Sequence, residues 1–73
     1  MYLVFCDGIL MVRRSWEHIH GVGNGSLVFR HRIKSGTVIS IVRHDAISTG
    51  QQDFHLFRNY EAGDSIPLDP PRG

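Results

Sequence analysis

The sequence predicts an all-β domain, built as a small antiparallel sheet or a partly open barrel of four to five strands. Several segments are rich in β-branched and aromatic residues, which favour strands. Others alternate apolar and polar residues with the period of two that is typical of a half-buried strand. Short glycine-containing turns separate these segments. The 73 residues leave room for one domain.

The first strand is expected at residues 2–6, and Asp7-Gly8 after it is typical of a type I′ hairpin turn. Residues 9–20 allow two structures, because four of their apolar residues also recur at helical spacing, namely Ile9, Val12, Trp16 and Ile19. We favour strands here, since most of these residues are weak helix formers and the segment contains no alanine. The alternative is an α+β fold with one helix near residues 9–20.

The middle of the chain predicts a hairpin. Residues 26–33 alternate between two faces, and residues 37–44 contain two isoleucines and two valines. A turn at Lys34-Ser35-Gly36 is expected to pair them. Residues 53–60 alternate as a further strand.

The domain is expected to span residues 1–62. Residues 63–73 hold all three prolines and are expected to form an extended or disordered C-terminal tail. Ile66 and Leu68 are the apolar residues that can anchor this tail, either on the domain or on a neighbour.

Composition narrows the classes of function. Cys6 is the single cysteine, so no internal disulfide forms and a reducing, cytoplasmic setting is the expectation. The apolar runs fall far short of the roughly 18 residues of a membrane span, so no membrane partner is expected. A domain of this size buries only about 60% of its unfolded surface. Self-association is the expected source of additional burial.

Four basic residues suggest an anion-binding surface. Arg30 and Arg32 share one face of the strand expected at residues 26–33, Lys34 continues the same alternation just after it, and Arg43 lies on its expected partner. Arginine suits bidentate contacts with phosphate. Together with three aromatic residues as stacking surfaces, this face resembles a platform for single-stranded nucleic acid of the Sm-like or OB-like barrel type; the aromatic residues are Trp16, Phe57 and Tyr60.

The five histidines suggest a second kind of site. On a strand, His18 and His20 point to the same face, and His44 can add a third ligand. The hypothesis is a zinc site with hydrolytic activity. On a helix the first two histidines would lie on different faces, and the hypothesis of a zinc site would be weaker.

Short stretches of the chain are similar to the bacterial Sm-like RNA chaperones. They are Tyr2-Leu3-Val4, Asp7-Gly8 and Ala46-Ile47-Ser48-Thr49. In that family a Lys-His pair of the uridine pocket precedes the Ala-Ile-Ser stretch, whereas this chain has His44-Asp45. The resemblance implies an RNA partner, adds to the nucleic-acid hypothesis and carries over no site residue.

No motif in the sequence requires an enzyme, since Cys6 lies in an apolar run and no serine has a nucleophile elbow around it. The sequence therefore predicts a non-catalytic binding or interaction module that acts through its sheet surface and forms a homo-oligomer. Single-stranded nucleic-acid binding and the histidine metal site are the two alternatives.

Overall fold

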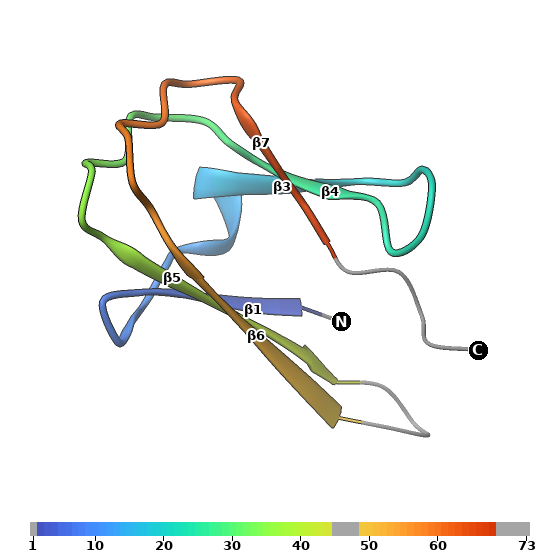
Figure 1. Ribbon diagram of the computed structural model, residues 1–73. Coiled ribbons are helices and arrows are strands. Elements are labelled where there is room, and N and C mark those ends of the chain that lie inside the picture. The colour runs from blue at the N-terminus through green and yellow to red at the C-terminus, as the bar shows by residue number, and fades with distance from the viewer. Residues whose placement is uncertain (1, 45–48, 69–73) are drawn as a thin grey trace.

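The structure is a computed structural model that describes residues 2–44 and 49–68, without the side chains of His44 and Thr49. Seven strands and one 3₁₀ turn follow one another along these residues: β1 (Tyr2–Cys6), β2 (Ile9–Leu10), η1 (Arg13–Ser15), β3 (Trp16–Ile19), β4 (Ser26–Phe29), β5 (Val38–His44), β6 (Thr49–His55) and β7 (Ser65–Pro67). The strands form two antiparallel sheets, which are not closed into a barrel (Figure 1). The predicted all-β class is confirmed.

The four-stranded sheet has the order β2-β1-β5-β6, and the three-stranded sheet has the order β3-β4-β7. The alternative helix near residues 9–20 is wrong. That segment instead forms β2, η1 and β3. The pairing of β3 with β4 from Trp16↔Phe29 to Ile19↔Ser26 outweighs the helical spacing of its apolar residues. No helix among the described residues is both long and apolar enough to cross a membrane.

The β1–β2 hairpin forms as predicted. Asp7 has φ 49° and Gly8 has φ 83°, so both turn residues have the positive φ that a type I′ turn requires. Cys6 pairs with Ile9 on either side of them. The carboxylate of Asp7 also accepts a hydrogen bond of 2.8 Å from the backbone N–H of Val38, which ties the turn to β5.

The hairpin predicted between residues 26–33 and 37–44 is wrong. β4 ends at Phe29 and pairs with β3 and β7, whereas β5 pairs with β1 and β6. Between them the chain crosses from one sheet to the other, with Ile33 in an isolated bridge to Tyr60. Eight residues separate the two strands, so no tight turn imposes their pairing.

The sequence predicts a further strand at residues 53–60. The structure has it earlier in the chain, as β6 at Thr49–His55, so only residues 53–55 belong to both ranges. The first residues of β6 are Thr49-Gly50-Gln51-Gln52, and among them only Thr49 belongs to the residue types that favour strands. They are extended because seven residues of β6 pair with β5, from His44↔Thr49 to Val38↔His55.

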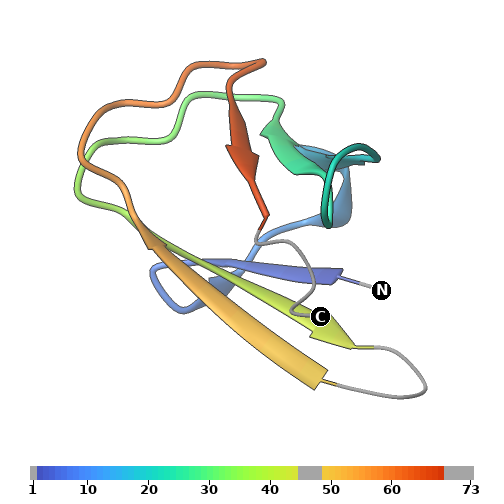
Figure 2. The same cartoon turned by 45° about the vertical axis from the view of Figure 1, so that its right-hand side comes forward.

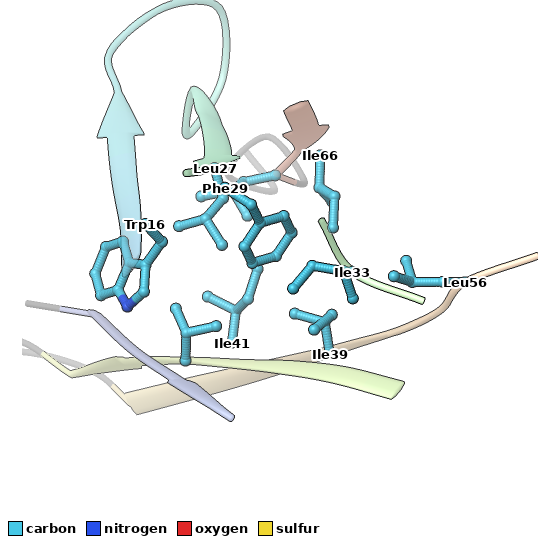
Figure 3. Packing of buried hydrophobic residues seen from close by; sticks show 10 residues of the cluster. Trp16, Leu27, Phe29, Ile33, Ile39, Ile41, Leu56 and Ile66 are labelled. Carbon is cyan, nitrogen blue, oxygen red and sulfur yellow. The ribbon is translucent and has the colours of Figure 1, made fainter. Parts of the chain in front are cut away.

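The core lies between the two sheets, and Figure 3 shows side chains from both sheets meeting there. Alternate residues of β4 and β5 supply it, as the period of two requires, together with single residues of β1, β3 and β7 and three residues outside the strands. It consists of Val4, Trp16, Leu27, Phe29, Ile33, Ile39, Ile41, Leu56, Ile66 and Leu68.

The segment expected as a C-terminal tail is described as far as Leu68. Ser65–Pro67 form β7 on β4, and Ile66 and Leu68 are buried in the core. The backbone N–H of Leu68 donates to the carbonyl of Gly25 at 2.9 Å. These two apolar residues therefore anchor the segment on the domain itself. Residues 69–73 lie outside the described residues.

Asp64 holds the turn before β7, and it makes stability depend on pH. Its carboxylate accepts hydrogen bonds from the backbone N–H of Glu61 and from the Arg58 guanidinium, each at 3.0 Å. These contacts, the Glu61 N–H first, lower the pKa of Asp64. A carboxyl with a lowered pKa stabilises the fold above its unfolded pKa of about 3.9 and loses that contribution as the pH falls through the folded value.

We therefore expect Asp64→Asn to lower stability at neutral pH, with a difference from the wild type that shrinks below about pH 4. Asparagine keeps an acceptor for the Glu61 N–H but removes the charge opposite Arg58. Urea unfolding followed by the fluorescence of the single tryptophan, at neutral and acidic pH, measures the difference. An equal difference at both pH values would show that the charge has no role.

Candidate functional site

An open groove of about 810 Å³ lies where the two sheets diverge. Figures 1 and 2 show this divergence on the side of the molecule that holds the N-terminus. The groove lies between the start of β1, the end of β5, and β3 with the loop that follows it. Its described lining consists of Tyr2, Leu3, Arg13, Trp16, His18, His20, Gly21, Gly23, Asn24 and Arg43.

The strand register places the floor of the groove. Tyr2 of β1 pairs with Arg43 of β5, so their side chains lie next to each other on one face of the four-stranded sheet. Two residues further along each strand, Val4 and Ile41 are buried between the sheets. Because side chains alternate with period two, Tyr2 and Arg43 face the same inter-sheet space, at the end where it opens.

Three rings form a row along one wall. The rings of Tyr2 and His18 are 4.7 Å apart between centroids, and those of His18 and His20 are 4.8 Å apart and nearly perpendicular. His18 Nε2 lies 2.7 Å from the carbonyl oxygen of Asn24. A carbonyl only accepts, so His18 Nε2 donates this hydrogen bond. His20 is exposed and forms the outer end of the row.

Two guanidinium groups flank the rings. Arg13 lies over the indole of Trp16, with 3.9 Å from Cζ to the ring centroid, and donates a hydrogen bond of 2.8 Å to the Trp16 carbonyl. Arg43 is half-buried, with one guanidinium nitrogen 3.5 Å from Oδ1 of Asn24. The described lining includes no carboxylate. Two guanidinium groups thus stand beside flat rings in the groove, a combination suited to an anionic ligand that carries a ring.

The four basic residues named from the sequence lie in different places. Because β4 ends at Phe29, Arg30, Arg32 and Lys34 are exposed in the connection that follows it, and the expected strand face does not form. Arg30 forms an ion pair with Glu17. Arg32 lies 3.7 Å from Glu61. Arg43 alone of the four lines the groove.

The proposed stacking residues are also separated. Trp16 is 3% exposed, so it belongs to the core and supports Arg13 rather than a ligand. Its indole Nε1 is buried and has no hydrogen-bond partner among the described residues. Phe57 is exposed, and Tyr60 lies under the guanidinium of Arg58 at 4.0 Å. None of the three offers a free face inside the groove.

The structure places two of the three predicted metal ligands together. His18 and His20 lie side by side, as expected for H-x-H on a strand, although His18 uses Nε2 for the Asn24 carbonyl. The side chain of His44 lies outside the described residues. Within residues 2–44 and 49–68, no three histidine, cysteine or acidic side chains gather as a metal site. The three-histidine zinc site stays a prediction.

Cys6 is half-buried at the end of β1. Burial, and secondly the negative charge of Asp7, raise the pKa of its thiol. A raised pKa reduces the thiolate fraction at neutral pH and so makes the thiol less reactive. Cys6 packs against the core, which fits its position in an apolar run of the sequence.

Tyr2, Arg13 and Asn24 belong to the groove, yet the sequence patterns do not single them out. They stand in different segments, and the pairing of strands brings them to one place. The alternation of side chains along any strand places Tyr2 on the same face as Val4. Only the register with β5 sets Tyr2 beside Arg43.

Comparison of the chain with protein-family models, with curated proteins and with solved structures finds no match. The short stretches similar to Sm-like chaperones thus gain no support as a family relationship. The geometry of the groove is therefore the basis on which a function can be proposed.

Proposed function

We propose that this domain is a non-catalytic binding module whose groove takes single-stranded nucleic acid. One observation carries the proposal. The row of rings formed by Tyr2, His18 and His20 lies beside Arg13 and Arg43.

This arrangement matches the chemistry of a single strand. Every nucleobase has a flat face that stacks on aromatic or imidazole rings, and such stacking contributes roughly 1–3 kcal/mol per base. Each nucleotide also carries one phosphate, for which a guanidinium is the preferred partner. The exposed ring of His20 offers a stacking face at the mouth of the groove, and Arg43 lies deeper, beside Tyr2.

Titration of a labelled single-stranded oligonucleotide, followed by fluorescence anisotropy, tests the proposal. If Arg13 and Arg43 each contact a phosphate, the logarithm of the affinity should fall against the logarithm of the salt concentration with a slope of about −1.4. Backbone amide shifts in NMR should change around Tyr2, His20 and Asn24 rather than around Arg32.

Two outcomes would overturn the proposal. One is the absence of binding at low salt. The other is binding of an acidic, tyrosine-containing peptide in the groove with no binding of the oligonucleotide. A reducing, cytoplasmic compartment forms part of the proposal, because Cys6 has no cysteine partner in the chain.

Self-association is a second proposed property, and the outer face of the four-stranded sheet, which meets the groove at Leu3, favours it. Val4 of β1 points into the core, so its neighbours Leu3 and Phe5 face outward from the four-stranded sheet. Leu3 pairs with Val42, and Phe5 pairs with Leu10 of β2. Leu10 is 55% exposed and Leu3 is 39% exposed. Apolar residues gathered on one sheet face are typical of a surface that another chain covers.

Leu10→Glu is therefore expected to abolish self-association without unfolding the domain, because the residue is already exposed. Sedimentation across micromolar concentrations should show an oligomer for the wild type and a monomer for the variant. Val22→Glu is the matched control, since Val22 is 99% exposed in the β3–β4 loop. A wild-type protein that sediments as a monomer throughout this range contradicts the expectation.

A further inference from the structure

A second, smaller hollow adjoins the groove. It has a volume of about 190 Å³ and lies over the paired ends of β5 and β6. Three of its lining residues also line the larger hollow, namely Tyr2, Asn24 and Arg43. The remaining described lining consists of Ile41, Gly50, Gln51 and Gln52. The two hollows are therefore neighbours, with these three shared residues between them.

The sizes of the hollows fit a ligand that uses both. Sites that enclose a whole small ligand measure about 300–1,000 Å³. The larger hollow, about 810 Å³, lies in this range, and the smaller one, about 190 Å³, lies below it. The smaller hollow thus suits one part of a ligand that continues from the larger hollow past Tyr2 and Arg43.

Gly50 keeps the smaller hollow open. It pairs with Arg43 in the β5–β6 register, so a side chain at this position would stand beside the Arg43 guanidinium. A Cβ added to Gly50 meets no atom within 4 Å, and the backbone there does not have a positive φ. Neither conformation nor packing therefore requires glycine at this position. What glycine provides here is free space next to Arg43.

The chemistry of the smaller hollow differs from that of the larger one. Gln52 pairs with the buried Ile41 and so faces the same side of the sheet. The Gln52 and Asn24 side chains carry carboxamides, which both donate and accept hydrogen bonds. Such groups suit the edges of a nucleobase, whereas the larger hollow offers ring faces.

We propose that the groove has two consecutive subsites and binds two adjacent nucleotides of a single strand. The first base lies in the larger hollow, against the row of rings. The second base lies in the smaller hollow, beside Gln52 and in the space that Gly50 leaves. Arg43 stands between the subsites, where it meets the phosphate that links the two nucleotides. This inference rests on the proposed binding of nucleic acid.

The length of the ligand tests the inference. A nucleoside monophosphate, a 5′-phosphorylated dinucleotide and the same dinucleotide with an abasic second position are titrated against the wild-type protein by calorimetry. We expect the dinucleotide to bind about tenfold or more tightly than the other two ligands, because only the dinucleotide has a second base that can stack and form hydrogen bonds in the smaller hollow. The abasic ligand has the same charge as the dinucleotide, so it separates the second base from the second phosphate.

Gly50→Val fills the smaller hollow and favours the strand that is already present. This substitution should lower the affinity for the dinucleotide to that for the monophosphate and leave the affinity for the monophosphate unchanged. Ser35→Val is the control, since it introduces the same side chain at an exposed position that lines neither hollow. If Gly50→Val does not fold, as judged by thermal unfolding, Gln52→Ala tests the same subsite.

The outcomes distinguish this inference from the proposed function. If neither these ligands nor a longer oligonucleotide binds, nucleic-acid binding itself is wrong. If the monophosphate and the dinucleotide bind equally, or if Gly50→Val weakens both ligands to the same degree, the groove binds nucleotides without a second subsite.

Discussion

Replacement of Gly25 by alanine is expected to destabilise the domain by about 2–5 kcal/mol, the sum of roughly 1–2 kcal/mol for a left-handed backbone and roughly 1–3 kcal/mol for overpacking. Gly25 has φ 80°, in the region that side chains disfavour. A Cβ there would lie 2.1 Å from the backbone carbonyl oxygen of Ile19. Because that oxygen belongs to the main chain of β3, the clash cannot be relieved by turning a side chain.

The loss is large for this protein. A chain of this length has a total stability of roughly 4–11 kcal/mol at the usual value per residue. Gly25 also connects distant parts of the fold, since its N–H donates to the carbonyl of Val22 at 3.1 Å and its own carbonyl accepts from Leu68. A shift of the loop at this position would move Asn24 as well, and with it one wall of the groove.

Two other glycines separate the causes. Gly8 has φ 83° but open space where a Cβ would lie, so Gly8→Ala should cost about 1–2 kcal/mol from conformation alone. Gly21 has neither feature, so Gly21→Ala should be nearly neutral. Urea denaturation followed by circular dichroism gives the three values. If Gly25→Ala unfolds at the same urea concentration as Gly21→Ala, then the β3–β4 turn differs from the one described.

Local chemistry accounts for the parts of the fold that the sequence predicted. Asp7-Gly8 fixes its own turn, because the positive φ at both positions is a property of those two residues. The β-branched run at residues 38–42 forms β5 for the same reason. The predicted partner of β4 is wrong because strand pairing between distant segments leaves no mark within a single segment. The same holds for β6, whose first residues become a strand only by pairing with β5.

The candidate site is predictable from the sequence in its chemistry but not in its arrangement. Charge and ring type single out Arg43, His18 and His20, and all three line the groove. In the sequence they belong to two separate hypotheses, a nucleic-acid platform and a metal site. The structure joins them at one place because the end of β5 lies opposite β3 and its loop. Tyr2 completes the site through its register with Arg43, which local sequence does not reveal.

The second large effect expected is on binding. Arg43→Gln should weaken the affinity for a single-stranded oligonucleotide about 10- to 150-fold at low salt, the equivalent of roughly 1.5–3 kcal/mol for a hydrogen bond to a charged group. Arg43 is the cation that borders both hollows among their described lining residues. Loss of one phosphate contact should also make the salt slope shallower by about 0.7.

The matched variants decide whether position or charge matters. Arg32→Gln removes the same charge from an exposed residue that pairs with Glu61, outside the groove, so its affinity should stay near that of the wild type. Arg43→Lys keeps the charge but not the planar fork, and should fall between wild type and Arg43→Gln. Since Arg43 also contacts Asn24, thermal unfolding must show that each variant remains folded. Equal losses of affinity for Arg32→Gln and Arg43→Gln would mean that the net charge of the protein, and not the groove, binds the oligonucleotide.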